Sequence, residues 1–345
     1  MPFYTKLCFF RYLRIAVWTC LSMIQFASAQ LTTIQKHTNA TQWLDQQGNA
    51  INAHGGSMLF HKGVYYWYGE IKEGPTTLVK GLSWACYRTN AGGVACYASK
   101  NLVDWKFMGK ALPPNTTDST HDLHFSGVLE RPKVIYNKKT KQFVMWLHVD
   151  NQVYGLAKVG VATSATPSGP FSYLGSFQPN KQMSRDMTIF KDDDEKAYLI
   201  YSSENNATMH ICLLSDDYLL PTSRYQRIFV HQYREAPALF KWQKRYYMIT
   251  SACTGWVPNA AMLAVADSLF GKWDNLGNPC RGNNSQTTFG AQSTFVFPVG
   301  KRQKKWIFMA DTWNMTQLAS SGYVWLPISF DSTAPTIPWQ THFSK

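Results

Sequence analysis

The stretch SRDMTIFKDDDEKAYLIY, Ser184 to Tyr201, decides the fold of this chain of 345 residues. It has a carboxyl at Asp186, an apolar run over 187–190, an acidic turn at 192–194 and a second apolar run that ends in YLIY. Two short runs rich in β-branched and aromatic residues, separated by a polar turn, are typical of a β-hairpin. The stretch therefore predicts a hairpin that is headed by a carboxylate.

Four other stretches repeat this design: GGSMLFHKGVYYWYGE (55–70), LERPKVIYNKKTKQFVMWLH (129–148), REAPALFKWQKRYYMITS (234–251) and GAQSTFVFPVGKRQKKWIFMAD (290–311). The polar residues that head four of the five hairpins follow one another at spacings of 56, 49 and 57 residues, and are Glu130, Asp186, Glu235 and Gln292. A second kind of run recurs between hairpins, at 96–112, 159–175 and 262–277. Each unit of roughly 50 residues thus holds about four strands, which is the size of a propeller blade.

The sequence therefore predicts an all-β protein with the fold of a five-bladed β-propeller. Its 15% aromatic residues and only 16% charged residues agree with many short, buried strands. We expect one propeller domain over residues 30–345, with blades at roughly 48–112, 125–178, 184–230, 233–280 and 288–331. Because the innermost strand of every blade runs along the central axis, the four head residues would meet at one mouth of the channel. The alternative is that each head residue faces solvent at the start of its own strand.

The amino terminus has the pattern of a secretory signal peptide. Positive charges at Lys6, Arg11 and Arg14 precede an apolar run at 15–26 and the small residues at 27–29. Removal of the first 29 residues would take the net charge from +13 to +10 and leave a secreted, extracellular protein. An uncleaved membrane anchor is the alternative. The rest of the chain has no apolar run of 18 residues, so we expect no membrane association after cleavage.

An oxidising compartment would allow disulfides. Cys86 and Cys96 flank YRTNAGGVA, which reads as a Gly-Gly turn between two strands and predicts a disulfide across a hairpin. Cys253 and Cys280 are a weaker candidate pair, and Cys212 is expected to be a buried free thiol. N-glycosylation sequons, which agree with secretion, occur at Asn39, Asn115, Asn206, Asn283 and Asn314.

The basic residues are scattered or lie in turns, and no nucleic-acid-binding motif accompanies them. This favours a solvated surface and no nucleic-acid partner, with weak attraction to anionic polysaccharides as the alternative. No cysteine or histidine spacing predicts a zinc site. We expect the acidic turn at 192–194 to be a solvated hairpin tip and not a metal site. No cofactor is expected, nothing in the sequence indicates a structural Ca²⁺ in the propeller channel, and we expect a monomer.

Three motifs, RDMTIFKDDDEKAYLIYSS, REAPALFK and FSGVLERPKVIYN, resemble glycoside hydrolase family 43, secreted five-bladed propellers that hydrolyse glycosides with inversion. AHGGSMLFHKGVYYWYGE, TGWVPN and TFGAQSTFVFPV resemble the subfamily 24-like branch of exo-β-1,3-galactanases, and the similarity covers residues 48–331. The resemblance implies release of galactose from the non-reducing end of β-1,3-galactan, the backbone of type II arabinogalactan. An α-L-arabinofuranosidase or β-xylosidase of the same family, or an inactive glycan-binding propeller, are the alternatives.

The resemblance also implies catalytic roles. An inverting glycosidase needs a general acid and a water-activating group on opposite faces of the sugar, about 6.5–9.5 Å apart. Glu235 matches the general acid of the family. Asp186 matches the carboxylate that raises the pKa of this acid and orients its side chain. The wider family has an aspartate base at the head of the first hairpin, but 51–60 contains no carboxyl here. In the galactanase branch the equivalent of Gln292 holds the water, by position alone or as an imidic tautomer, while Glu130 binds sugar or is the alternative base.

Six further positions resemble galactose-contacting residues of the branch. Hydroxyl-rich sugars need such polar groups together with an aromatic face. Asn206 is both one of them and a sequon, and an asparagine that faces a pocket could not carry a glycan. The six positions are Glu70, Tyr154, Asn205, Asn206, Thr254 and Trp256.

Overall fold

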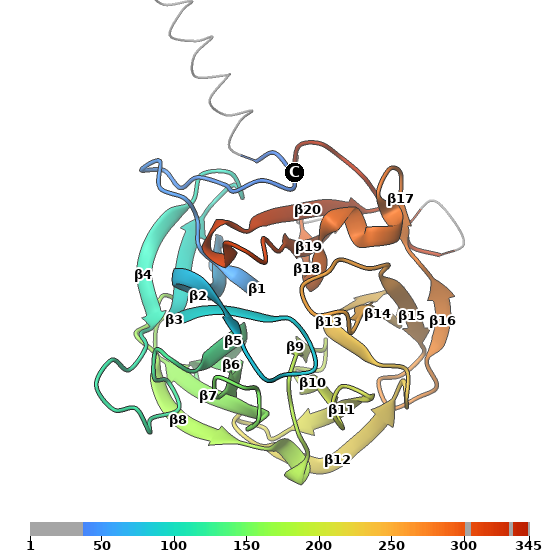
Figure 1. Ribbon diagram of the computed structural model, residues 1–345. Coiled ribbons are helices and arrows are strands. Elements are labelled where there is room, and N and C mark those ends of the chain that lie inside the picture. Colours follow the sequence, from blue (N-terminus) through green and yellow to red (C-terminus); the bar gives the residue numbers. More distant parts are fainter. Residues whose placement is uncertain (1–36, 301–304, 331–333, 344–345) are drawn as a thin grey trace, which may run out of the picture.

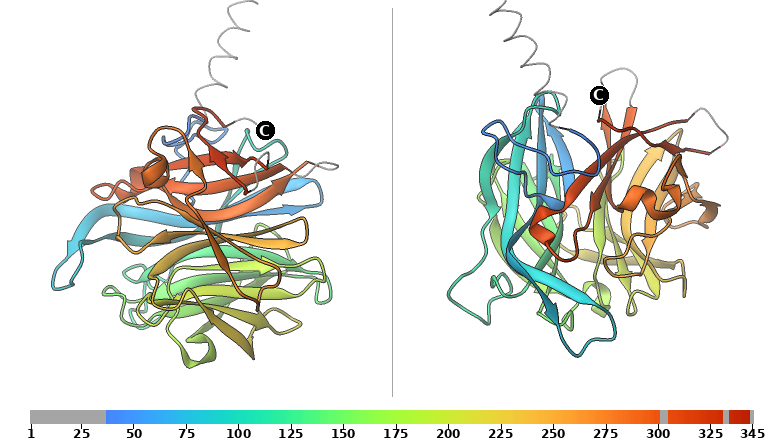
Figure 2. Two further views of the ribbon diagram at one scale, coloured as in Figure 1. Left: turned by 90° about the vertical axis from the view of Figure 1, so that its right-hand side faces the viewer. Right: turned by 45° about the horizontal axis from the view of Figure 1, so that its top comes forward.

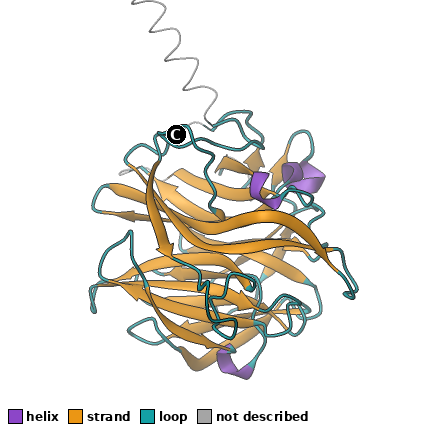
Figure 3. Ribbon diagram, turned by 60° about the vertical axis from the view of Figure 1, so that its left-hand side comes forward, coloured by secondary structure: helices purple, strands orange, loops and turns teal. Residues whose placement is uncertain are grey.

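The computed structural model describes residues 37–300, 305–330 and 334–343, so the predicted signal peptide at 1–29 lies outside the described residues. Five antiparallel sheets surround a central axis, and the predicted five-bladed β-propeller is confirmed (Figure 1). Strands and loops make up nearly all of the described chain (Figure 3). No helix in this part of the chain has the length and apolar character needed to span a bilayer.

Four of the five sheets have four strands each. Blade one contains β1 (His54–His61), β2 (Val64–Val79), β3 (Cys86–Ser99) and β4 (Lys106–Leu112). Blade two contains β5 (Val128–Asn137), β6 (Gln142–Asp150), β7 (Lys158–Ser164) and β8 (Ser172–Phe177). Blade three contains β9 (Met187–Lys191), β10 (Ala197–Ser203), β11 (Thr208–Leu214) and β12 (Pro221–Ile228). Blade four contains β13 (Arg234–Trp242), β14 (Arg245–Ala252), β15 (Met262–Ala266) and β16 (Asp274–Gly277).

The fifth sheet has three strands and not the expected four. It consists of β18 (Gln292–Val299), β19 (Lys305–Thr312) and β20 (Gly322–Ile328). Beside this sheet, β17 (Cys280–Arg281) pairs in parallel with β21 (Ile337–Pro338). The described chain has three short 3-10 segments, η1 (Pro179–Lys181), the kinked η2 (Ser285–Gly290) and η3 (Leu318–Ser320).

The amino-terminal segment covers the edge of β20 and closes the ring. Thr41 forms a bridge with Tyr323. Asn39, which is 3% exposed, donates from Nδ2 to the carbonyls of Trp325 and Gln340 at 3.2 and 2.9 Å, and Trp325 N–H donates back to its Oδ1 at 2.8 Å. Because side-chain and bridge contacts satisfy the edge, blade five needs no fourth strand.

A cluster of buried tryptophans holds blades one and five together at this seam. The ring of Trp67 lies 4.8 Å from that of Trp325 and 5.4 Å from that of Trp105, and Trp43 lies 4.9 Å from Trp325. All four are fully buried. Burial of rings this large is the main source of stability in a core, so the closure depends on aromatic packing as well as on the hydrogen bonds of Asn39.

A recurrent irregularity aims the head residues of the blades. The ladder shifts register just after His54, Glu130 and Glu235. In each case the next residue is left-handed, with φ of +56° at Gly55, +54° at Arg131 and +53° at Ala236. A bulge with one left-handed residue bends the strand and redirects the side chain beside it. The repeated bulge therefore takes these side chains out of the pleat at the point where the strands reach the mouth.

The expected disulfide between Cys86 and Cys96 is wrong. Both residues lie on the single strand β3, ten residues apart, which is about 30 Å along a strand, whereas a disulfide needs Cα atoms within about 7 Å. Gly92 is a close-approach residue and not a turn, because a Cβ there would come within 2.4 Å of Ile71 Cγ2. Cys253 and Cys280 are free as well, and Cys212 is a buried free thiol as expected.

The acidic turn of blade three also differs from the expectation in one residue. Asp192 is only 8% exposed and accepts hydrogen bonds from Lys241 Nζ at 2.6 Å and from the Tyr246 hydroxyl, both on blade four. Asp193 and Asp194 are exposed, as predicted for a tip. Asp192 therefore joins two blades, since a buried carboxylate requires donors such as these.

Candidate active site

All four predicted head residues line one pocket at the mouth of the propeller. Glu130, Asp186, Glu235 and Gln292 come from blades two, three, four and five, and they surround a cavity of about 230 Å³. This volume lies below the roughly 300–1,000 Å³ of pockets that enclose larger ligands. The cavity therefore suits one small polar molecule, about the size of a single ring, and not an extended chain.

Glu235 is held as a protonated acid. Its Oε1 accepts a hydrogen bond from Gln292 Nε2 at 2.9 Å, and its Oε2 accepts one from Asn206 Nδ2 at 3.3 Å. Burial and the negative charge of Asp186 raise the pKa of Glu235 to about 8. At neutral pH the carboxyl can therefore donate a proton to a bound ligand.

Arg131 binds both Asp186 and Gln292, the two side chains beside Glu235. Its Nε lies 3.0 Å from Oδ1 of Asp186 and its terminal nitrogen 2.9 Å from Oδ2, which is a bidentate ion pair. It also donates to the carbonyl of Ser293 at 3.0 Å and to Oε1 of Gln292. Since Arg131 is 5% exposed and lines the pocket, it fixes the position of both side chains from within the pocket wall.

The amide of Gln292 has only one possible orientation. Its Oε1 accepts from Arg131 and from Trp313 Nε1 at 3.0 Å, and both partners can only donate. Its Nε2 donates to Glu235 and, at 3.0 Å, to the hydroxyl of Ser251. Both lone pairs and both N–H groups are thus occupied, so an ordinary amide here has no free lone pair with which to take a proton from water.

Glu130 is an ionised anchor and a weak base. Its Oε1 accepts from Lys72 Nζ at 3.1 Å and from the Tyr154 hydroxyl at 2.9 Å, and its Oε2 lies 3.6 Å from Nδ1 of His148. Burial alone would raise the pKa of Glu130, but Lys72 and then His148 outweigh it and hold this pKa well below its usual range. Burial would lower the pKa of His148, but the hydrogen bond to Asp150 at 3.0 Å and the nearby charge of Glu130 raise it to about 9.

The head position of blade one is His54, which stands where a carboxylate heads the hairpins of blades two to four. His54 is fully buried, and its Nδ1 lies 3.3 Å from Oδ1 of Asp311. Its partner in the ladder is Glu70, which is 2% exposed, lines the pocket and lies 3.3 Å from Lys72 Nζ. Burial, partly offset by Lys72, raises the pKa of Glu70 to about 7.

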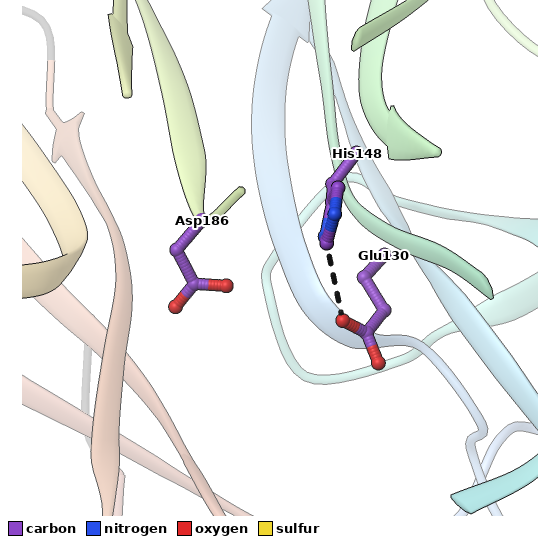
Figure 4. Close-up of side chains that lie close together, drawn as sticks. All are labelled: Glu130, His148 and Asp186. Atoms are coloured by element: carbon purple, nitrogen blue, oxygen red, sulfur yellow. Dashed lines mark ion pairs between the residues drawn. The ribbon is translucent and has the colours of Figure 1, made fainter. Parts of the chain in front are cut away.

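Glu130, His148 and Asp186 also form a group of metal-type ligands, with one donor atom of each within 4.8 Å of the others (Figure 4). Each carboxylate of this group already binds a cationic side chain, Lys72 for Glu130 and Arg131 for Asp186. A metal ion would have to compete with both resident cations. We therefore assign the three residues to the ion-pair network of the pocket.

Four of the six predicted sugar contacts line the pocket: Glu70, Tyr154, Asn206 and Trp256. Asn205 is exposed and lies elsewhere. Thr254 is also exposed, and its hydroxyl donates to the Val257 carbonyl at 2.6 Å, so it shapes the loop. Its neighbour Cys253 lines the pocket in its place.

An aromatic wall forms one part of the lining. The rings of Trp256 and Trp313 meet edge to face at 5.1 Å, and Lys72 Nζ lies 5.4 and 5.5 Å from their centroids.

Three buried polar atoms in the pocket lining have no hydrogen-bond partner: Trp256 Nε1, Asn206 Oδ1 and Arg185 Nε. A ligand with several hydroxyl groups would supply both the acceptors and the donors that these atoms lack.

Several lining residues could not be inferred from the repeat. Arg131 follows a head residue directly, and its inward direction results from its left-handed φ. Trp313 lies two residues beyond Asp311, which pairs with Gln292 in the ladder. The lining residues that the sequence reasoning missed are Trp84, Arg131, His148, Arg185, Cys253, Gly255 and Trp313.

A propeller mouth with a protonated carboxylic acid, a second carboxylate beside it and an aromatic wall defines a glycoside hydrolase. The family described as "Glycosyl hydrolases family 43" matches residues 75–311. The chain belongs to glycoside hydrolase family 43.

Solved structures of this family are similar over most of the chain. A family 43 β-1,3-galactosidase with galactodeoxynojirimycin is 41% identical, with 89% of this chain and 100% of that chain covered and a TM-score of 0.83. An exo-β-1,3-galactanase from Phanerochaete chrysosporium with β-1,3-galactotriose is 37% identical over 87% and 66% of the two chains, with a TM-score of 0.78. One from Clostridium thermocellum is 39% identical over 88% and 65%, with a TM-score of 0.77. Among curated proteins no sequence matches.

Proposed function

We propose that this protein is a secreted exo-β-1,3-galactanase that releases galactose, with inversion, from the non-reducing end of the backbone of type II arabinogalactan. The observation that carries the proposal is the protonated Glu235 beside Asp186 in a pocket of about 230 Å³. The galactose-type ligands named for the similar enzymes support galactose as the sugar, over the arabinose or xylose of other family members.

In this mechanism Glu235 donates its proton to the glycosidic oxygen as the bond to the anomeric carbon breaks. Asp186, held by Arg131, keeps Glu235 protonated until that step. A sugar that enters must break the hydrogen bond between Gln292 and Glu235, because inverting groups stand on opposite faces of the ring. This frees Gln292 Nε2 to donate a hydrogen bond that positions the attacking water. The water oxygen bonds to the anomeric carbon on the face opposite Glu235, and the proton that it loses passes to solvent.

The hydrogen bonds favour Gln292 as the residue that positions the water. Arg131 and Trp313 hold its oxygen, so its nitrogen is the atom available to a ligand. Glu130 is the less favourable base, because three donors surround it and its pKa is depressed. Binding of a sugar hydroxyl is the role that best fits Glu130.

The test is incubation with linear β-1,3-galactan, followed by NMR of the first product. We expect α-galactose as the initial product, which would establish substrate, end-directed action and inversion together. Glu235→Gln should abolish release while it leaves binding of galactose intact. Initial β-galactose, release of arabinose or xylose instead, or unchanged turnover by the variant would contradict the proposal.

A further inference from the structure

The hairpin of β2 and β3 continues far beyond blade one. We call its outer part, residues 71–93, the strap. From Glu70 to Val79 it extends by nine residues, about 30 Å at the usual rise of a strand. It runs across the front of the ring toward the central axis in Figure 1 and stands out from the face in Figure 2. Its turn brings Trp84 into the lining of the pocket.

Two other blades fix the ring of Trp84 at the pocket. The ring meets Tyr154 of blade two edge to face, with 5.6 Å between centroids. On the side of blade four, a Cβ at Gly255 would lie 3.4 Å from Cε3 of Trp84, so the indole rests against the bare backbone of that loop. Trp84 nevertheless stays 37% exposed. It is thus a held aromatic ring with part of its surface open.

The base of the strap is anchored on both sides. Arg88, 9% exposed, donates to the carbonyls of Ser126 and Gly127, the latter at 2.6 Å. Thr76 Oγ1 accepts from the N–H of Leu318 at 2.8 Å, which ties the strap to η3. These contacts hold the strap over the mouth, and a rigid support of this kind lowers the ordering cost of a binding site.

We propose that Trp84 is the platform for the sugar on the leaving side of the cleaved bond, and that the strap restricts the site to chain ends. This inference rests on the proposed function. Glu235 must reach the bridging oxygen, so the second sugar lies just outside the one-ring cavity, at the rim where Trp84 is exposed. Aromatic faces bind the apolar face of a sugar ring. A polymer could not pass through the mouth, because the strap crosses it.

The first experiment compares β-1,3-galactotriose with β-galactosyl fluoride, whose leaving group is a single atom and needs no platform. For Trp84→Ala, we expect KM for galactotriose to rise about tenfold. We also expect the ratio of kcat/KM for galactotriose to kcat/KM for the fluoride to fall about fivefold or more. Changes of this size correspond to the binding energy of one aromatic contact. Trp84→Phe should restore most of this ratio. Leu78→Ala is the matched control, since Leu78 is a 49% exposed strap residue outside the pocket lining.

Equal loss on both substrates by Trp84→Ala, or no loss on either, would overturn the platform. If the unaltered enzyme hydrolysed neither substrate, the proposed function would itself fail, and this inference with it. For the strap as a whole, residues 74–89 can be replaced by Asn-Gly, because Glu73 and Asn90 already face each other in the ladder. We expect early digests of β-1,3-galactan by this variant to contain oligosaccharides; release of galactose alone would refute the restriction to chain ends.

Discussion

Replacement of Glu235 by glutamine should stabilise the protein at neutral pH while it abolishes activity. The ordinary pKa of a glutamate is 4.5, whereas that of Glu235 in the folded protein is about 8. Below pH 4.5 the carboxyl is protonated in both states. Between the two values the unfolded chain releases the proton and the folded protein keeps it, so the free energy of unfolding falls as pH rises.

The size of this effect follows from the pKa difference. At 1.36 kcal/mol per unit, the penalty at pH 7 is about 3 kcal/mol. Glutamine has the shape of the protonated acid, keeps a carbonyl for the hydrogen bond from Gln292 Nε2, and does not ionise. Its amide nitrogen replaces the oxygen that accepts from Asn206 Nδ2, and it can donate to the unpartnered Oδ1 of Asn206 when that amide flips. For a chain of this length about 2 °C accompanies each kcal/mol. We therefore expect Glu235→Gln to melt about 6 °C above the unaltered protein at pH 7.

The assay is thermal unfolding of both proteins at pH 4.5 and at pH 7. The melting temperatures should nearly coincide at pH 4.5 and separate at pH 7. Glu73→Gln is the matched control, because the Glu73 side chain is 56% exposed in a surface pair with Lys110, and loss of an exposed pair changes the stability of a protein little. If the difference for Glu235→Gln were the same at both pH values, or if the variant were the less stable protein at pH 7, Glu235 would not be a protonated acid in the folded protein.

Three further outcomes are expected. Activity should decline as pH rises through the pKa of Glu235, and Asp186→Asn should move this decline to lower pH by about one unit, because one source of the raised pKa is lost; an unmoved pH–rate profile would contradict the coupling. Gln292→Ala should lose activity on β-1,3-galactan, and if Glu130→Gln alone were inactive while Gln292→Ala turned over normally, the two roles would be reversed. Thiol titration in denaturant should find all five cysteines of the region after residue 29 reduced, and loss of any pair would indicate a disulfide.

The fold was predictable because the repeat is carried by local pattern. Four polar residues occupy the same position at the start of successive hairpins: Glu130, Asp186, Glu235 and Gln292. Because the blades are related by rotation about one central axis, equivalent positions at the inner ends of the blades lie close together, here around one pocket. Their convergence could therefore be inferred from spacing alone, whereas the choice of enzyme branch required the resemblance of whole motifs.

The rest of the site depends on backbone geometry that no pattern encodes. Arg131 reaches Asp186 and Gln292 through a left-handed residue in a bulge, a conformation that arginine seldom adopts. Gly92 looked like a turn residue, but it is a glycine because Ile71 leaves no room for a Cβ. Because a turn was predicted at this position, the sequence did not predict the length of the strap or the position of Trp84 in the pocket lining.

The hydrogen bonds between Asn39 and the chain around β20 have a consequence for the production of the protein. Asn39 lies in a sequon, yet its Nδ2, the atom to which an N-glycan attaches, is the donor that joins the amino-terminal segment to β20. Both hydrogens of this buried nitrogen are donated, so a sugar attached to it would remove at least one of these hydrogen bonds and would have to be accommodated at a site that is 3% exposed. We therefore expect glycosylation of this sequon to weaken the seam between blades one and five, and a host that does not glycosylate it to give the more stable protein.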